Sequence, residues 1–223
     1  MLRFRRLFPF ISLRRKRPTG SGFGCGRGQP IDRYFIERFL KQHEHDIQGR
    51  VLEIGDSRYT KQFGGEAVNQ SEILHVTDQS SATIVADLAN APNIPSNTYD
   101  CIICTQTLQY IFDVHAAVRT IHRILKPQGT VLATVPCICQ ISRYDMDRWG
   151  DYWRFTSLST RRLFSDVFSE NATTIEVSGN RIAALAFVDG LVQEELRPTD
   201  LDFFDADYEL NIAVRATKAK TSR

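Results

Sequence analysis

A complete strand–helix–strand pattern decides the fold: YDCIICT (99–105), DVHAAVRTIHRIL (113–125) and TVLATVP (130–136). The first and third segments are apolar on both faces, which is typical of strands that helices cover on both sides of a parallel sheet. In the middle segment Asp113 is placed to cap a helix, because the apolar residues that follow it recur at helical spacing. The residues KPQG (126–129) end that helix. The pattern therefore predicts a β-α-β crossover.

The same alternation of apolar runs and helical patterns extends in both directions from this crossover. Further strands are expected at residues 50–55, 72–78, 82–88, 173–178 and 209–217, and further helices at 32–47, 157–168 and 181–196. The sequence contains no internal repeat. It therefore predicts one α/β domain over residues 31–223, with a Rossmann-like, seven-stranded, mainly parallel sheet and helices on both faces.

The first 30 residues differ from the rest of the chain in charge. They hold eight of the 28 basic residues and none of the 26 acidic residues, so the remainder is acidic overall. This distribution argues against a nucleic-acid-binding fold, whose basic residues would form a patch on the folded surface. Residues 1–30 are expected to form a basic, flexible segment, with the glycine-rich stretch 20–28 as a linker. The segment is either a solvated tail or a contact to an anionic membrane surface through its Phe and Leu side chains.

The apolar segments of the chain favour a cytoplasmic protein. The run at residues 7–13 is too short for a signal peptide and is interrupted by Pro9. No stretch reaches the ~18 apolar residues that a membrane-spanning helix needs. Peripheral attachment at the inner membrane surface, through the basic N-terminal segment, is the alternative that stays open.

The five cysteines are odd in number and mostly lie in apolar runs, which favours reduced, buried thiols. The close pairs Cys101/Cys104 and Cys137/Cys139 raise the alternative of a zinc site, since two such pairs are a usual source of four thiolate ligands. Positions i and i+3 of a strand face opposite sides, however, so Cys101 and Cys104 would point apart. The sequence therefore predicts no metal site.

Polar residues follow four successive strands of the predicted sheet. These strand ends carry Glu53 and Gly55, then Asp78, then Asp87 and Leu88, and finally Thr105 and Gln106. In parallel sheets of this type, ligands bind outside the carboxyl ends of the strands. A glycine there lets the backbone approach a ligand, and a carboxylate can accept a hydrogen bond from a ribose hydroxyl or an adenine amino group. Each residue alone also fits a turn or a helix cap, but the set favours a nucleoside site.

Four stretches of the sequence resemble the ordered motifs of class I methyltransferases that depend on S-adenosylmethionine (SAM). They are residues 51–55, 86–88, 99–109 and 121–129, and the resemblance extends over residues 31–217. It implies an enzyme with SAM as its cofactor. The implied contacts are Glu53 and Gly55 at the methionine end of SAM, Asp78 on the ribose, Asp87 and Leu88 on the adenine, and Gln106 beside the methyl group.

The loop after the first predicted strand departs from the motif of that family. Ser57 and Tyr59 stand where the pattern Gly-x-Gly-x-Gly has its second and third glycines, and a bulkier loop would narrow the site. SAM has no pyrophosphate, so this loss is less damaging than it would be for a dinucleotide. Two other functions stay open. One is a nicotinamide-dependent reductase, which the lost glycines and the absence of a Tyr-x-x-x-Lys pair disfavour; the other is a non-catalytic SAM-binding scaffold in a glycan assembly complex.

A second resemblance concerns residues 148–156, RWGDYWRFT, which are similar to a methyltransferase subgroup associated with bacterial surface-polysaccharide synthesis. It implies a sugar hydroxyl or a glycan precursor as the acceptor. Acceptor contacts are expected from Tyr144, Arg148, Trp149, Tyr152, Trp153 and Arg154, because the segment follows the fifth strand at the edge where ligands bind. Asp147 is the candidate general base for a hydroxyl acceptor, and His115 is the second candidate. The alternative for this segment is a lid whose aromatic residues pack on the sheet.

Overall fold

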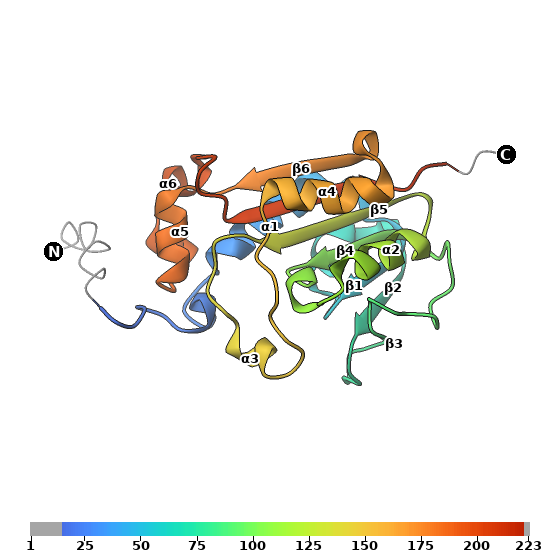
Figure 1. The fold of residues 1–223 in the computed structure, drawn as a ribbon, viewed down its shortest axis with the longest axis horizontal. Coiled ribbons are helices and arrows are strands. Elements are labelled where there is room, and N and C mark those ends of the chain that lie inside the picture. The colour runs from blue at the N-terminus through green and yellow to red at the C-terminus, as the bar shows by residue number, and fades with distance from the viewer. Residues whose placement is uncertain (1–14, 221–223) are drawn as a thin grey trace.

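The computed structural model describes residues 15–220, which form a seven-stranded sheet with helices around it (Figure 1). The strands are β1 (Gly49–Ile54), β2 (Val68–His75), β3 (Ile84–Val85), β4 (Tyr99–Thr105), β5 (Leu125–Pro136), β6 (Thr173–Ser178) and β7 (Asn211–Thr217). They lie in the order β3-β2-β1-β4-β5-β7-β6. The first five strands pair in parallel, and β7 pairs antiparallel with both β5 and β6. The predicted Rossmann-like, mainly parallel sheet is confirmed.

Helices cover both faces of this sheet. They are α1 (Ile31–Gln42), α2 (Val114–Ile124), α3 (Arg143–Met146), α4 (Ser157–Phe168), α5 (Arg181–Val188) and α6 (Pro198–Asp202). In Figure 1, α2 and α4 lie in front of the sheet and α1 lies behind it. The Asp113 carboxylate caps α2, as predicted, by accepting a hydrogen bond from the backbone amide of Ala116 (2.9 Å). Within residues 15–220, no helix is both long enough and apolar enough to cross a membrane.

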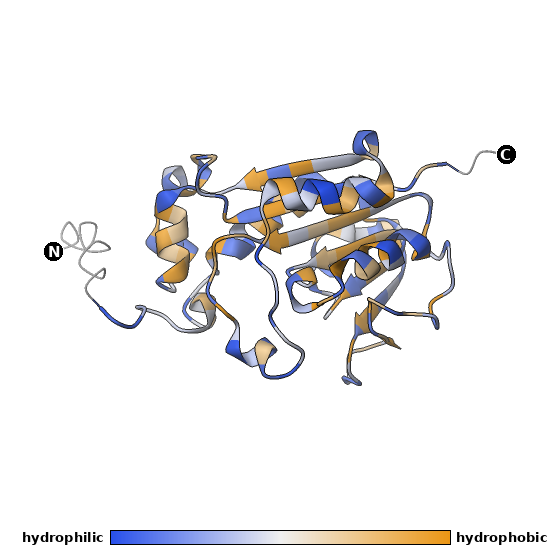
Figure 2. Ribbon diagram, in the orientation of Figure 1, coloured by the Kyte–Doolittle hydropathy of each residue, from blue (hydrophilic) through white to orange (hydrophobic). Residues whose placement is uncertain are grey.

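The two faces of the sheet carry separate hydrophobic cores. One core joins α2 and α4 to strand residues such as Ile102, and the other joins α1 to strand residues such as Ile103. Cys104 belongs to the first core and Cys101 to the second, so these buried thiols point to opposite faces, as strand geometry requires. Figure 2 shows hydrophobic residues along the strands and both hydrophobic and hydrophilic residues on the helices. This is the pattern of helices that bury one side only.

The late helix is shorter than the sequence predicts. It was expected to run over residues 181–196, but α5 ends at Val188. The chain turns at Gly190, where φ is +71° and the backbone packs against Gly20. A Cβ atom at Gly190 would lie 2.2 Å from the Gly20 carbonyl oxygen, so only glycine fits this close approach.

The glycine-rich stretch expected to be a flexible linker is instead packed against the region around α5. Thr19 donates its hydroxyl to the Asp189 carboxylate (2.6 Å), and the ring of Phe23 lies 5.7 Å from that of Phe187. The prediction of a linker is therefore wrong. It failed because these contacts join residues far apart in the sequence. The expected membrane contact falls largely on residues 1–14, which lie outside the described part of the chain.

Candidate functional site

Two cavities open at the carboxyl ends of the parallel strands. The first, called here the β1 cavity, has a volume of about 200 Å³ and is lined by residues that follow β1 and β4. The second, called here the α3 cavity, has a volume of about 170 Å³ and is lined by α3, the end of β5 and the N-terminal stretch. Asp32, Arg33 and Gln106 line both cavities. The two cavities therefore share one wall.

Glu53 lines the β1 cavity but directs its hydrogen bonds into the protein. Its buried carboxylate accepts from the backbone amides of Tyr59 (3.0 Å) and Thr60 (2.7 Å) and from the Thr60 hydroxyl (2.7 Å). Burial raises the pKa of Glu53 to about 7, although these hydrogen bonds act in the opposite direction. Tyr59, at one of the expected glycine positions, packs into the core beside α1. Tyr59 thus lies mostly in the core, and it also forms part of the lining of the β1 cavity.

Charged side chains of both signs line the β1 cavity. Asp32 and Asp56 supply carboxylates, and Arg33 and Arg58 supply guanidinium groups. The Arg58 guanidinium is also paired with Glu37 (3.2 Å). A ligand that carries an ammonium and a carboxylate group would find opposite charges for each of them. This arrangement suits the amino-acid end of a ligand.

Gln106 stands between the two cavities in a conformation that its neighbours fix. Its φ of +45° is uncommon for a residue with a side chain. Its backbone amide donates to the carbonyl of Thr134 (2.9 Å), and its side-chain amide donates to the buried Asn211 (3.0 Å). Gln106 was predicted to lie beside the methyl group of SAM. It belongs to the wall that the two cavities share, and two ligands in these cavities would meet at this wall.

The residues expected on the nucleoside lie beyond the β1 cavity. β2 ends at His75, three positions before the predicted end, so Asp78 lies in the exposed loop that follows. Asp87 is exposed after β3, and its carboxylate accepts from the backbone amide of Ala89 (2.9 Å). Leu88 is buried. These three residues line neither cavity, and their roles on a nucleoside stay predictions.

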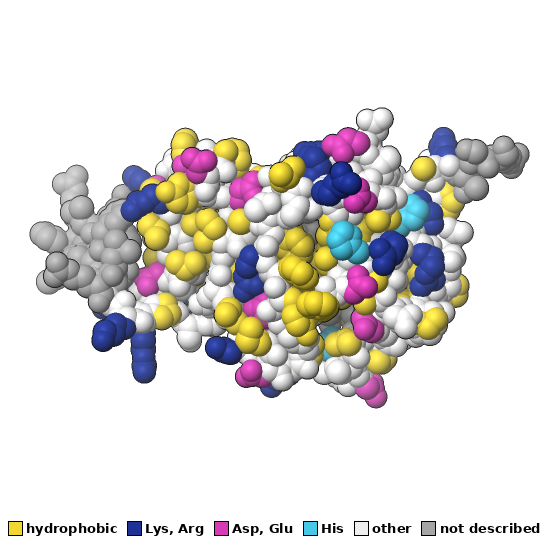
Figure 3. Space-filling view, in the orientation of Figure 1, with side chains coloured by type: hydrophobic (Ala, Val, Ile, Leu, Met, Phe, Trp, Pro, Cys, Tyr) yellow, Lys and Arg dark blue, Asp and Glu magenta, His cyan; other side chains and the backbone are white. Residues whose placement is uncertain are grey.

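The segment after β5 is placed differently from expectation. Of the six residues expected to contact the acceptor, Arg154 alone lines the α3 cavity. Tyr144 is 64% exposed, and the Arg148 guanidinium lies 3.6 Å from its ring centroid. Tyr152 and Trp153 pack with an exposed phenylalanine, and Figure 3 shows hydrophobic side chains gathered in the middle of this outer face. Acceptor contact by these residues therefore stays a prediction, and their side chains cover the outside of the segment.

Trp149 lies beside the carboxyl end of β2. Its ring centroid lies 5.7 Å from that of His75, the last residue of β2. Trp149 lines neither cavity and is partly buried against this strand end. Acceptor contact by Trp149 therefore stays a prediction as well. The structure places it on the side of the sheet where the nucleoside was predicted.

The predicted general base, Asp147, lies outside both cavities. It is exposed at the end of α3, and the second candidate, His115, is exposed on α2. Asp145, two positions earlier, lines the α3 cavity instead. One turn of helix carries residues two positions apart to different sides, so Asp145 lines the α3 cavity and Asp147 does not, and the role of Asp147 as a base stays a prediction.

A buried ion pair forms part of the wall of the α3 cavity. Arg154 donates to both carboxylate oxygens of Asp151 (2.6 and 2.9 Å), whose side chain is 1% exposed, and also to the carbonyl of Gln140 (2.8 Å). Burial would raise the pKa of Asp151, but the hydrogen bonds from Arg154 and from the Ser142 amide hold it below its ordinary value. The pair fixes the course of the segment around the cavity.

Gln109 and Asp32 are among the polar residues of the α3 cavity that were not predicted from the sequence. Gln109 is buried, donates its side-chain amide to the carbonyl of Gln106 (2.8 Å), and has no hydrogen-bond partner for Oε1 within the described residues. Asp32 lines both cavities from the first turn of α1. Asp32 has the sequence signature of an ordinary acidic residue in a first helical turn, so no local signal set it apart. Gln109 follows a strand end by four residues, and this position was the one available hint.

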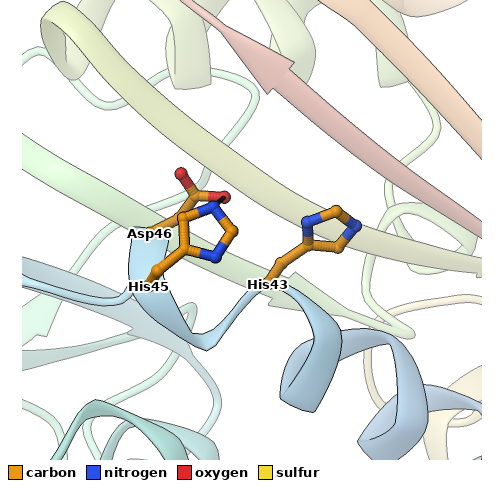
Figure 4. Close-up of side chains that lie close together, drawn as sticks. All are labelled: His43, His45 and Asp46. Carbon is orange, nitrogen blue, oxygen red and sulfur yellow. Dashed lines mark ion pairs between the residues drawn. The ribbon is translucent and has the colours of Figure 1, made fainter.

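One cluster of possible metal ligands occurs in the described part of the chain, but its contacts do not support a metal site. His43, His45 and Asp46 lie close together in the turn before β1, at the opposite edge of the sheet from the two cavities (Figure 4). Both oxygens of Asp46 already accept from the Arg215 guanidinium (2.7 and 2.9 Å). The His43 imidazole is likewise 2.7 Å from Glu176. The ligand atoms are thus engaged within the protein.

Comparison with known protein families decides the assignment. A family profile described as "Methyltransferase domain" matches residues 5–172, which is most of the chain. The chain belongs to this methyltransferase family. The predicted cofactor, SAM, is the methyl donor of the class. A curated relative, the mitochondrial arginine-hydroxylase of Rattus norvegicus, is 27% identical over 118 residues, and the match spans 53% of this chain but only 29% of that protein.

Solved structures show the same fold at low sequence identity. A SAM-dependent methyltransferase from Archaeoglobus fulgidus has a TM-score of 0.56 at 11% identity, with 83% of this chain and 94% of that chain covered. The N-methyltransferase NodS from Bradyrhizobium japonicum, in complex with S-adenosylhomocysteine, has a TM-score of 0.53 at 13% identity, with 86% and 89% covered. The cyclase SpnF has a TM-score of 0.56 at 14% identity, with 97% and 94% covered.

The β1 cavity of this methyltransferase fits SAM by the chemistry of its lining. SAM ends in an amino acid, and the cavity offers Asp56 to the ammonium group and Arg33 and Arg58 to the carboxylate. Gly55 has a φ of +94° and no atom within 4 Å of where a Cβ would be, which leaves the backbone open to a ligand. Glu53 would hold this loop in place rather than bind the cofactor itself.

Proposed function

We propose that this methyltransferase transfers a methyl group from SAM, bound in the β1 cavity, to an acceptor bound in the α3 cavity. One observation carries the proposal: Asp32, Arg33 and Gln106 line both cavities. A donor and an acceptor in adjoining cavities would meet at these residues. Methyl transfer is a direct displacement, so alignment of the two reactants supplies much of the rate enhancement.

The protein would contribute orientation and exclusion of water. SAM supplies a methyl group activated by its sulfonium. Asp56 and Arg58 hold its amino-acid end, and Asp78 and Asp87 hold the nucleoside. On the acceptor side, Phe23 and Phe187 form an apolar wall of the α3 cavity and limit the access of water.

The acceptor we propose is a sugar hydroxyl or a glycan precursor. Support comes from the polar lining of the α3 cavity, which offers carboxylates, an amide oxygen and a guanidinium group to several hydroxyls. The resemblance of residues 148–156 to the polysaccharide-associated subgroup points the same way. The similar hydroxylase and cyclase show that proteins related in sequence or fold carry other chemistries, so the assay must identify the product.

A transfer assay with isotope-labelled SAM tests the proposal. The protein is incubated with nucleotide sugars and short glycans, and the products are separated and analysed by mass spectrometry. We expect a product heavier than its acceptor by 14 mass units plus the mass of the isotope label, for one added methylene equivalent, and equimolar S-adenosylhomocysteine. Hydroxylated or cyclised products without methyl label would contradict methyl transfer.

Asp78→Ala and Asp87→Ala should each weaken SAM binding without unfolding the chain. Each replacement removes an expected hydrogen bond to the nucleoside, worth about 0.5–1.5 kcal/mol. Both residues are exposed, so the free energy of unfolding should change little. Calorimetric titration with SAM, paired with a thermal melt, measures both quantities. Wild-type affinity in both folded variants would place the nucleoside elsewhere.

Trp149→Ala should lower the affinity for S-adenosylhomocysteine, because Trp149 lies against His75 at the strand end next to the predicted nucleoside. An aromatic contact of this kind contributes about 0.5–1.5 kcal/mol beyond its buried area. Trp153→Ala is the matched control, since Trp153 packs on the outer surface and should leave the affinity unchanged. Calorimetric titration of both variants with S-adenosylhomocysteine measures the two affinities. Equal affinities would return Trp149 to a purely structural role.

A further inference from the structure

We propose that Asp32 is the general base of the reaction and takes the proton of the acceptor's hydroxyl group at the junction of the two cavities. This inference rests on the proposed methyl transfer. It adds a catalytic residue and restricts the acceptor to one that loses a proton as it is methylated.

The position of Asp32 carries the first part of the argument. Asp32 is the carboxylate that lines both cavities, so it faces any point at which ligands in the two cavities touch. One carboxylate oxygen accepts from the backbone amide of Arg33 (2.9 Å). Within residues 15–220 the carboxylate has no ion pair and no other hydrogen bond. An oxygen with free lone pairs is thus available at the junction.

The other acidic residues around the cavities are already engaged. Asp151 accepts two hydrogen bonds from Arg154, and Asp145 accepts one from the Ser142 hydroxyl. Asp56 accepts from the backbone amide of Arg58 (2.8 Å) and lines the β1 cavity alone. Glu53 is saturated by its three donors. Asp56 is no more engaged than Asp32, but it faces one cavity only, so Asp32 is the carboxylate best placed at the junction.

The electrostatic surroundings of Asp32 suit proton transfer near neutral pH. The titratable groups that line the cavities with it are Arg33 on its own helix; Glu53, Asp56, Arg58 and Tyr59 around the β1 cavity; and Tyr110, Cys139, Asp145, Asp151 and Arg154 around the α3 cavity. Burial raises the pKa of Asp32 to about 6, and the backbone amide and charge of Arg33 act in the opposite direction. A base whose pKa lies close to the working pH is ionised yet still takes up a proton.

Gln109 provides an independent indication of what the α3 cavity binds. Its side chain is 3% exposed, and its Oε1 has no partner within the described residues. A buried carbonyl oxygen without a donor costs free energy unless a ligand supplies one. The amide nitrogen of the same side chain is held by the Gln106 carbonyl, so Oε1 cannot exchange places with it at no cost. The acceptor is therefore expected to carry a hydrogen-bond donor, as a polyhydroxylated sugar does.

The step balances with these groups alone. The acceptor oxygen forms a bond to the methyl carbon, the bond between that carbon and sulfur breaks, and its electron pair goes to sulfur. The hydroxyl proton goes to the Asp32 carboxylate, which later releases it to solvent. The products are a methyl ether and S-adenosylhomocysteine, and the positive charge of the sulfonium leaves as that proton.

Asp32→Asn tests the proposal with little change in shape. We expect the transfer rate at pH 7.5 to fall by about 10²–10⁴-fold, the usual contribution of a general base, while titration shows SAM affinity changed by less than about threefold. The wild-type rate should rise with pH through about 6 and then level, and the variant should lose this inflection. Asp32→Glu should recover part of the rate. Asp166→Asn, on the exposed surface of α4, is the matched control.

Thermal melts give a readout that does not depend on activity. Because the pKa of Asp32 is raised in the folded protein, the stability linked to its neutral form is present below pH 3.8 and is lost as pH rises through about 6. Asp32→Asn should therefore melt higher than the wild type at pH 8 and similarly at pH 4. Asp32→Ser repeats the assay if the asparagine variant does not fold.

The outcomes separate the two proposals. An active wild type with equally active, folded Asp32 variants overturns the role of Asp32 and leaves methyl transfer standing. A wild type that binds SAM but methylates no hydroxyl acceptor overturns the proposed function, and the role of Asp32 falls with it. Loss of transfer together with an unchanged pH inflection would also overturn the proposal, because a base must account for both.

Discussion

We expect Glu53→Ala to lower the free energy of unfolding by about 3 kcal/mol and to abolish measurable SAM binding. Glu53 accepts from two buried backbone amides and from the Thr60 hydroxyl. Alanine leaves these donors without partners, and each unsatisfied buried group costs about 1–3 kcal/mol. The melting temperature of a domain of this size should fall by roughly 6–12 °C, at about 2–4 °C for each kcal/mol. The loop that carries Gly55, Asp56 and Arg58 would lose its anchor at the same time.

Denaturant unfolding of Glu53→Ala and of Glu66→Ala measures this effect, since Glu66 is exposed and serves as the matched control. Glu53→Gln adds a test of protonation. Because burial raises the pKa of Glu53 to about 7 in the folded protein, the stability linked to the neutral acid is present below pH 4.5 and is lost as pH rises through about 7. The wild type should lose stability relative to Glu53→Gln across that window. Equal stability of the two alanine variants would contradict the anchoring role.

Asp151→Ala should destabilise the protein by about 3–5 kcal/mol, because removing one partner of a buried ion pair leaves an uncompensated charge. The Asp151 side chain is 1% exposed, and Arg154 would keep only its carbonyl partners. The wall of the α3 cavity would loosen, so the KM for the acceptor should rise more than the Kd for SAM. The double variant Asp151→Ala/Arg154→Met should be more stable than Asp151→Ala, since the unpaired charge is gone.

Asp166→Ala gives the matched comparison for this ion pair. Asp166 pairs with Arg162 on the exposed surface of α4, and breaking such a pair costs less than about 1 kcal/mol. The lowered pKa of Asp151 means that the contribution of its charged form is present above pH 3.8 and is lost as pH falls below that value. Unfolding measured at pH 7 and pH 3 checks both points. An Asp151→Ala variant as stable as Asp166→Ala would show that the pair is not structural.

The sheet could be predicted from the sequence because its strands are covered on both faces. Such strands are apolar throughout, so Tyr99–Thr105 was delimited correctly from composition alone. Thr173–Ser178 was also delimited correctly, although it is an edge strand with several polar, partly exposed residues. β2 was placed less well, since its first residues are polar and partly exposed. The helix expected after residue 181 was too long because its end depends on Gly190 meeting Gly20, a contact between distant parts of the chain.

The site could be predicted only as a region. Strand ends gave Gln106 and Glu53, because topology alone brings them to the ligand edge. The positions of Asp147 and Trp149 outside both cavities could not be predicted, because the direction of a side chain in an irregular segment depends on packing that no local pattern encodes. Asp32 was missed because it lies in the first turn of a helix that the sheet order, and not the sequence, brings to the cavities.

Calorimetric titration of the wild-type protein with SAM, repeated with NADH, tests the central claim most directly. The acidic strand ends, the paired charges of the β1 cavity and the loss of two motif glycines all favour SAM over a dinucleotide. We predict a saturable heat of binding for SAM with one site per chain and none for NADH. Saturable binding of NADH, with no heat from SAM, would contradict the account.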